Sequence, residues 1–230
     1  MSSRPELRID WCTHEAAKYA VEKWHYSRCM PKSKLAKFGV WESGTFIGSV
    51  IFGVSANRFL SSPYGLAPTE VCELVRVALT KHDNSVSRIL AITLKMLRKE
   101  FGNLRLVVSF ADPLCNHHGG IYQAGNWLYT GRCSPSTEVF HKRKWIKRVD
   151  STRGHTGEKR IVPGKHRYLM PLDEAMRKQI EPLRKPYPKR VRSDTGDTPA
   201  NHAGEEGSAP IRTLSDSPTP SDLEPPCQRN

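Results

Sequence analysis

Side chains that could do chemistry are concentrated in one short stretch of the sequence, residues 106–131 (LVVSFADPLCNHHGGIYQAGNWLYTG). Its apolar start, residues 106–110, predicts a buried strand, and Asp112, His117, His118 and Tyr122 follow that strand. In open α/β sheets, ligands bind in the crevice beyond the carboxyl ends of the strands. A carboxylate, two imidazoles and a phenol at that place are groups that transfer protons, so the stretch predicts an active site.

The elements that must position this stretch can be read from periodicity and from turn residues. Residues 7–12 alternate like a strand, and Thr13 is a suitable N-cap for a helix after it. Two strand-like runs flank Ser43-Gly44, which has the length and residue types of a tight hairpin turn. Residues 69–80 suit a buried central strand, and residues 81–101 an amphipathic helix. This order predicts a mixed α/β sheet with helices on its faces.

Charge and composition divide the chain near its C-terminus. Residues 193–230 are rich in Pro, Ser, Thr and Gly and hold two basic and seven acidic residues, so they carry −5. The total of +13 therefore leaves +18 on residues 1–192, which favours a polyanionic partner. Basic charge alone does not distinguish nucleic acid from an acidic membrane. We expect a domain over residues 1–185 and a disordered Pro/Ser/acidic tail over 186–230, which could compete with the polyanionic partner for the basic face.

Other classes of protein are disfavoured by what the sequence lacks. The six cysteines form no CxxC pair, which argues against a zinc ribbon and against a secreted disulfide scaffold. The sequence shows no signal peptide and no apolar run of membrane-spanning length, so we expect an intracellular protein without membrane contact.

Four segments, WHYSR (24–28), EVCELVRVAL (70–79), SFADP (109–113) and HHGGIYQAGNWLYTG (117–131), resemble the phage Mu-type Mom family of DNA modification proteins, whose fold is GNAT-like. The resemblance implies a GNAT-like mixed central sheet flanked by helices. It also implies transfer of a carbamoylmethyl group to adenine N6 in double-stranded DNA, in the host cell cytoplasm, as protection against restriction. The rivals are an N-acetyltransferase acting on a small amine or protein and a non-catalytic DNA-binding protein.

Adenine N6 is a weak nucleophile inside the base stack, so such an enzyme must flip the base and activate it. We expect His25 or Asp112 to take the N6 proton, and Tyr26 and Tyr122 to position or stack on adenine. The resemblance makes iron a candidate, with His25, Asp112 and His117 or His118 as ligands. The alternatives are a buried His25 at a helix end and solvated histidines at 117 and 118.

We expect the donor to be acetyl-CoA or another carrier of the added group. In the GNAT pattern a glycine-rich turn before the helix binds pyrophosphate, but the matching KHDNSVSRIL (81–90) has no glycine. Ser85, Ser87 and Arg88 could still receive a phosphate, although Ser85 could serve only as a helix cap. Arg76 could bind the donor or a phosphate, or it could form an ion pair. Strand alternation places its side chain on the same face as that of Glu70 and on the opposite face from that of Glu73.

Basic residues near aromatic side chains predict a DNA surface, against the alternative of a solvated charged face. The candidates are Arg28, Lys142, Arg143, Lys144, Lys147, Arg148, Lys165 and Arg167. The sequence does not specify an oligomeric state.

Overall fold

The computed structural model describes residues 5–33, 35–55, 57–141, 144–147 and 157–189. The predicted tail, apart from residues 186–189, lies outside the described residues. The elements, in chain order, are β1 (Leu7–Trp11), α1 (His14–Trp24), β2 (Leu35–Glu42), β3 (Thr45–Gly53), η1 (Ser62–Tyr64), η2 (Pro68–Glu70), β4 (Val71–Leu79), α2 (Val86–Glu100), β5 (Leu106–Ala111), η3 (Pro113–Cys115), α3 (Gly120–Ala124), β6 (Leu128–Arg132), β7 (Ser136–His141), β8 (Lys144–Lys147), β9 (Lys159–Val162), β10 (His166–Pro171), α4 (Glu174–Ile180) and η5 (Glu181–Leu183).

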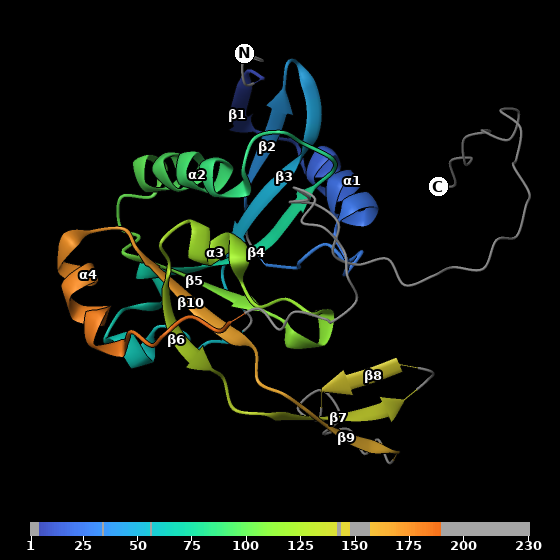
Figure 1. Ribbon diagram of the computed structural model, residues 1–230, viewed down its shortest axis with the longest axis vertical. Coiled ribbons are helices and arrows are strands. Elements are labelled where there is room, and N and C mark those ends of the chain that lie inside the picture. The colour runs from blue at the N-terminus through green and yellow to red at the C-terminus, as the bar shows by residue number, and fades with distance from the viewer. Residues whose placement is uncertain (1–4, 34, 56, 142–143, 148–156, 190–230) are drawn as a thin grey trace, which may run out of the picture.

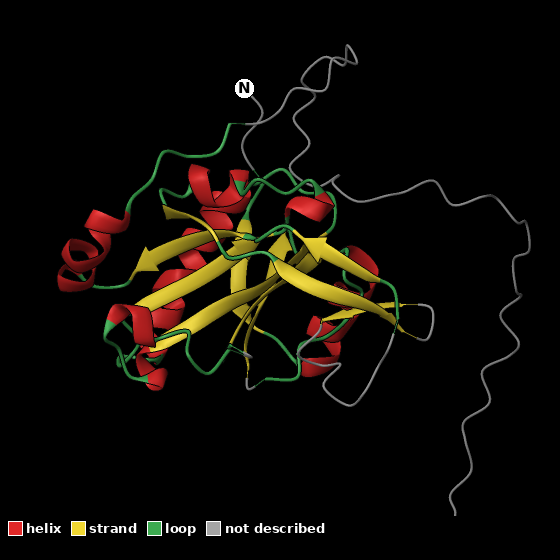
Figure 2. Cartoon of the chain, turned by 90° about the horizontal axis from the view of Figure 1, so that it is seen from below, coloured by secondary structure: helices red, strands yellow, loops and turns green. Residues whose placement is uncertain are grey.

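A seven-stranded mixed sheet, in the order β1-β2-β3-β4-β5-β10-β6, forms the body of the protein (Figure 1). Its neighbouring strands are antiparallel except β4 and β5, which run parallel. Figure 2 shows helices on both sides of this sheet. The predicted mixed α/β sheet with flanking helices is therefore confirmed.

Local signals account for the N-terminal half of the fold. The side chain of Thr13 accepts a hydrogen bond from the backbone N–H of Ala16 and begins α1. Ser85 caps α2 in the same way through the N–H of Arg88. Ser43 and Gly44, with φ of 46° and 81°, make the left-handed turn between β2 and β3, which confirms the predicted hairpin.

The helices bury different faces of the sheet. On one face, Ile89 and Leu90 of α2 pack in a cluster that includes Cys72 and Leu74 of β4. On the other face, α1 packs against Ile51 and Ala78, and α4 packs against neighbouring residues such as Leu106 and Val108. The alternation of side chains along β4 and β5 supplies both cores.

The parallel pair β4–β5 is short, and this opens the sheet. Pairing covers only Val71–Glu73 and Leu106–Val108, while β4 continues to Leu79 and β5 to Ala111. A register shift opposite Ile51 and Phe52 places an extra residue in β4 between Leu74 and Arg76. Beyond this bulge the two strands no longer pair, and a gap remains between their carboxyl ends.

The bulge also corrects the predicted placement of Arg76. Val75 packs with the α1 cluster, and the Arg76 side chain reaches Cys29 in the segment after α1, so two successive residues face the same side. Arg76 therefore shares the α1 side with Glu73, and the prediction that they lie on opposite faces was wrong. Glu70 precedes the strand, where its carboxylate accepts from the backbone N–H of Ala67.

A separate three-stranded sheet, in the order β8-β7-β9, is inserted between β6 and β10 and projects from the body (Figure 1). We call it the wing, meaning β7, β8 and β9. It leaves the main sheet where β6 ends and β10 begins, and His166 at that point pairs with Ala111 at the end of β5. The wing thus starts at the edge of the sheet where β4 and β5 separate. In the described part of the chain, no helix has the length and apolar character needed to cross a membrane.

Candidate active site

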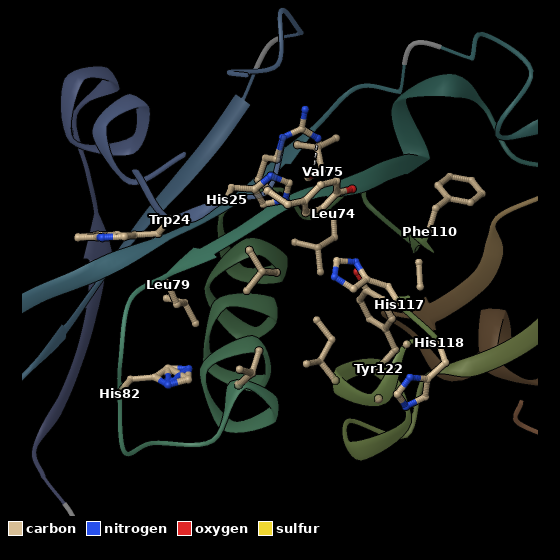
Figure 3. Close-up of a pocket in the computed structure, with 18 residues that line it drawn as sticks. Trp24, His25, Leu74, Val75, Leu79, His82, Phe110, His117, His118 and Tyr122 are labelled. Atoms are coloured by element: carbon tan, nitrogen blue, oxygen red, sulfur yellow. Dashed lines mark hydrogen bonds between the residues drawn. The ribbon is translucent and has the colours of Figure 1, made fainter. Parts of the chain in front are cut away.

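A cavity of about 390 Å³ occupies the gap between β4 and β5 (Figure 3). One end is formed on the α1 side by His25, Tyr26 and Arg76, and we call it the α1 end. The other is formed by His82 and Val86 at the start of α2, and we call it the α2 end. His117 and Tyr122 line the wall that follows β5. A cavity lined from both faces of the sheet can bring two reactants together.

His25 ends α1 and is 8% exposed. Its Nδ1 accepts a hydrogen bond from the backbone N–H of Ser27, with N and Nδ1 3.1 Å apart, and lies 2.8 Å from the Ser27 hydroxyl. A neutral ring with an accepting Nδ1 carries its proton on Nε2. Burial, followed by the charges of Arg76 and His117, lowers the pKa of His25 to about 3. The residue is therefore a neutral hydrogen-bond donor at neutral pH and a weak base.

Tyr26 is the aromatic residue presented to solvent at the α1 end. It is 43% exposed, and its ring lies against His25 with centroids 4.3 Å apart and an interplanar angle of 32°. The ring of His117 meets it edge-on at 5.1 Å. Partial burial raises the pKa of the Tyr26 hydroxyl, so this group stays protonated. The structure brings together His25, Tyr26 and His117 from two distant segments.

Arg76 fastens the segment after α1 to β4. Its Nε and one terminal nitrogen donate to the carbonyl of Cys29 at 3.3 and 3.1 Å, and the other terminal nitrogen donates to the carbonyl of Val75 at 2.7 Å. Both acceptor carbonyls are neutral, and the ion pairs found among the described residues do not include Arg76. A guanidinium has five N–H groups, so two remain for an anionic or carbonyl group at this end.

Asp112 stands beside the cavity and is not part of its wall. One carboxylate oxygen accepts from the backbone N–H of Leu114 at 3.1 Å, and the other lies 2.7 Å from the ammonium of Lys165. Its carbonyl accepts from the backbone N–H groups of Cys115 and His117. Asp112 therefore shapes the turn that presents His117, and both of its carboxylate oxygens are already engaged.

Tyr122 lines the cavity but is 7% exposed, with its ring packed near Trp127 and Tyr168. The hydroxyl of Ser109 lies 2.9 Å from that of Tyr122 and 3.0 Å from the carbonyl of Leu74. Because a carbonyl can only accept, Ser109 donates to Leu74 and Tyr122 donates to Ser109. Burial raises the pKa of Tyr122 to about 12. Its ring is placed to form the cavity wall and not to stack openly on a base.

The Gly-Gly pair after the histidines has a structural explanation. Gly119 has φ of 86° and precedes α3, and a Cβ there would lie 2.3 Å from the ring of Tyr168. The Tyr168 hydroxyl donates to the carbonyl of His118 at 2.5 Å. This contact fixes the backbone between His117 and α3, so the wall of the cavity depends on it.

The side-chain carboxylate of Glu42 holds the turn before α2 in place. Glu42 accepts from the backbone N–H groups of Asp83 at 3.0 Å and of Asn84 at 2.6 Å, and from the Asn84 amide at 2.8 Å. Burial opposes ionisation of Glu42, but these hydrogen bonds and the charge of His82 outweigh it and lower its pKa. Of the predicted donor-binding residues, Ser85 caps α2, Ser87 lies 3.3 Å from Ser85, and Arg88 donates to Asn84.

The predicted iron ligands do not come together as a metal site. Within the described ranges, no group of three or more His, Cys, Asp or Glu residues is placed to hold an ion. His25 uses Nδ1 for Ser27, and Asp112 uses its oxygens for Leu114 and Lys165. The donor set of His25, Asp112 and His117 therefore does not fit iron, and no step is derived through a metal.

The predicted DNA-contacting residues fall into three groups. Arg28 is exposed beside the α1 end, while Lys165 pairs with Asp112 and Arg167 donates to Thr130 at 2.8 Å. Lys144 and Lys147 belong to β8 of the wing. Lys142, Arg143 and Arg148 lie outside the described residues.

Several residues of this region were not found from the sequence. They are Ser109, Glu42 and His82. Glu42 and His82 carried no local signal, because each acquires its role from a partner or cavity formed by distant segments. The position of Ser109 within a buried strand was the one available hint, since a buried hydroxyl needs a partner.

Comparison with known proteins agrees with the sequence motifs. Residues 6–189 match the model of the Mom protein family. The chain is 28% identical over 206 residues to the methylcarbamoylase Mom of Escherichia phage Mu, covering 80% of this chain and 84% of that protein.

Solved acetyltransferase-like structures show a distant likeness. The N-acyl amino acid synthase FeeM from uncultured soil microbes matches with a TM-score of 0.46 and 10% identity, covering 76% of this chain and 94% of that one. An N-acetyltransferase from Staphylococcus aureus Mu50 matches with a TM-score of 0.44 and 16% identity, covering 73% and 98%. Likeness at this level says nothing about the chemistry of the site. The family match spans most of the chain, and the chain therefore belongs to the Mom protein family.

Proposed function

We propose that this protein modifies phage DNA in the host cytoplasm by adding a carbamoylmethyl group to adenine N6, as protection from restriction. The observation that carries the proposal is the two-ended cavity between β4 and β5, with a partly exposed tyrosine and two imidazoles at one end. Membership of the Mom family and the relationship to the phage Mu methylcarbamoylase support the reaction class.

Adenine enters at the α1 end in this proposal. A flipped base stacks on the exposed ring of Tyr26, as bases do on aromatic platforms. The Nε2–H of His25 donates to a ring nitrogen of the base, because its Nδ1 is held as an acceptor by Ser27. The two spare N–H groups of Arg76 bind a flanking phosphate or the carbonyl of the donor. Tyr122 closes the wall behind the base.

The reaction forms a bond between N6 and the CH2 carbon of the transferred group. N6 loses one proton, and the leaving group of the donor departs with the electron pair of its bond to that carbon. We assign removal of this proton to His117, since imidazole is the usual general base and this ring lies in the cavity wall against Tyr26. Asp112 acts as a positioning residue for the turn that carries His117. The low pKa of His25 makes it the weaker candidate for this step.

Double-stranded DNA lies across the α1 end and the wing in this arrangement. Residues 1–192 carry +18, and the wing begins beside the ends of β5 and β10. Arg28, Lys165 and Arg167 provide phosphate contacts, which fix orientation while the cavity selects the base. Such binding weakens steeply as salt concentration rises.

The test is mass spectrometry of nucleosides from plasmid DNA of cells that express the protein. We expect a deoxyadenosine heavier by a carbamoylmethyl group, with fragmentation that places the group on N6. Unmodified deoxyadenosine alone, from cells in which the protein is folded and abundant, contradicts the proposal. An acetylated adenine, or an acetylated amine without change in DNA, indicates an N-acetyltransferase instead.

A further inference from the structure

The turn beside the α2 end of the cavity already binds a carboxylate where a phosphate-bearing donor would need open amides. The carboxylate of Glu42 accepts three hydrogen bonds, two from the backbone N–H groups of Asp83 and Asn84 and one from the Asn84 amide. Glu42 is 9% exposed, and Asn84 is itself fixed by Arg88 and by the carbonyl of Pro5. The turn before α2 is thus closed by a network of the protein's own side chains.

The first turn of α2 is also partly occupied. The N–H of Arg88 is taken by the hydroxyl of Ser85, which is itself 3.3 Å from that of Ser87. A pyrophosphate brought here would meet the negative charge of Glu42 and would have to displace it from three donors. Like charges in close contact and the loss of buried hydrogen bonds both oppose this exchange.

His82 offers a different kind of contact at the same end. It lines the cavity, and its Nε2 is buried without a hydrogen-bond partner among the residues that the structure describes. Figure 3 shows its ring extending from the loop between β4 and α2 toward the helix. A buried nitrogen without a partner costs free energy, which a ligand's polar group can recover.

We infer that the α2 end takes a compact donor without a pyrophosphate group, whose carbonyl or amide forms a hydrogen bond with Nε2 of His82. This rests on the proposed function, because it names the class of donor for the same cavity. It assigns His82 as a specificity-determining residue and Glu42 as the group that excludes a nucleotide-type donor. The transferred unit reaches adenine by passing between β4 and β5.

The binding test uses calorimetric titration of the full chain with coenzyme A and with inorganic pyrophosphate. We expect no saturable binding of either up to millimolar concentration. Glu42→Ala, which frees the amides, is expected to gain pyrophosphate binding, and Glu42→Gln serves where that variant does not fold. Micromolar binding of coenzyme A by the wild-type chain, displaced by pyrophosphate, overturns the inference whether or not DNA is modified.

The activity test compares His82→Ala with His14→Ala, an exposed histidine on α1, by the modified deoxyadenosine content of plasmid DNA. His82→Ala is expected to lower that content at least tenfold while DNA affinity and melting temperature stay at the wild-type values. Full modification by His82→Ala overturns the role of His82. Absence of modification in the wild type instead contradicts the proposed function, and the titration with coenzyme A still decides which donor class the α2 end admits.

Discussion

The ammonium of Lys165 lies 2.7 Å from the carboxylate of Asp112, and this ion pair joins the base of the wing to the turn that carries His117. Lys165 immediately precedes β10, and Asp112 immediately follows β5. The carboxylate raises the pKa of Lys165 against the opposing effect of burial. The ion pair therefore links the segment after β9 to the turn before His117, which gives Asp112 a positioning role.

Asp112→Ala should reduce both stability and modification. It removes the ion pair and the acceptor for the N–H of Leu114, which together cost about 1–2 kcal/mol in the free energy of unfolding. Asp112→Asn keeps an acceptor for Leu114 and should recover most of the melting temperature but not the modification. Glu174→Ala, which breaks an exposed pair with Arg177, is the control. Wild-type levels of modified deoxyadenosine with Asp112→Ala would show that the reaction does not need this residue.

Tyr26 should act through its ring. Stacking of a base on an aromatic side chain contributes about 1–3 kcal/mol, so Tyr26→Ala should lower modification by about tenfold or more. Tyr26→Phe keeps the ring and should stay within about threefold of wild type. Tyr19→Ala, on an exposed tyrosine of α1, controls for loss of surface aromatic area. Equal activity of Tyr26→Ala and Tyr19→Ala contradicts the stacking role.

Arg76 should not be replaceable by lysine. A guanidinium donates at once to the carbonyls of Cys29 and Val75, whereas an ammonium lacks the planar fork that spans them. Arg76→Lys should therefore loosen the segment that carries His25 and Tyr26 and lower modification at least tenfold. Arg98→Lys, on the exposed last turn of α2, should leave activity unchanged. The amount of modified deoxyadenosine per mole of folded protein is compared between these two variants.

The fold could be predicted from the sequence where its signals are local. Thr13, Ser85 and Ser43-Gly44 each act within a few residues, and they fixed α1, α2 and the first hairpin. The bulge in β4 reversed the side of Arg76, because an extra residue in a strand leaves no trace in its apolar pattern. The wing was not predicted, since its strands are short and acquire their pairing only from one another.

The candidate site, too, could be predicted from the sequence only where the signal is local. The stretch after β5 was selected from its composition, and the structure places the rings of His25, Tyr26 and His117 in contact. Their roles depended on partners that sequence could not supply. Ser27 fixes the tautomer of His25, Lys165 engages Asp112, and Glu42 reaches Asn84 across 42 residues of sequence.

The buried neutral imidazole of His25 should make stability depend on pH. Its pKa is lowered to about 3 in the fold, whereas an unfolded histidine titrates near 6.5. Below pH 6.5 the unfolded chain binds a proton that the folded chain does not, so stability is full above this value and is lost toward pH 3. Urea unfolding should show a slope of up to about 1.4 kcal/mol per pH unit from this group. His25→Gln should flatten the slope, and an identical slope contradicts the assignment.

Alanine should destabilise the protein much more at Gly119 than at Gly120. Alanine at Gly119 needs φ of 86° and puts a Cβ 2.3 Å from the ring of Tyr168, which is fixed by its hydrogen bond to His118. The strain and displaced ring should cost at least about 2 kcal/mol. Gly120 lies in the first turn of α3, where a Cβ meets the movable tip of His118 at 3.3 Å, so Gly120→Ala should change stability by less than about 1 kcal/mol. The melting temperature and the modified deoxyadenosine content are measured for both variants. A difference between the two variants indicates a packed cavity wall and not a flexible loop. Equal stability of both variants would mean that Tyr168 does not hold this wall.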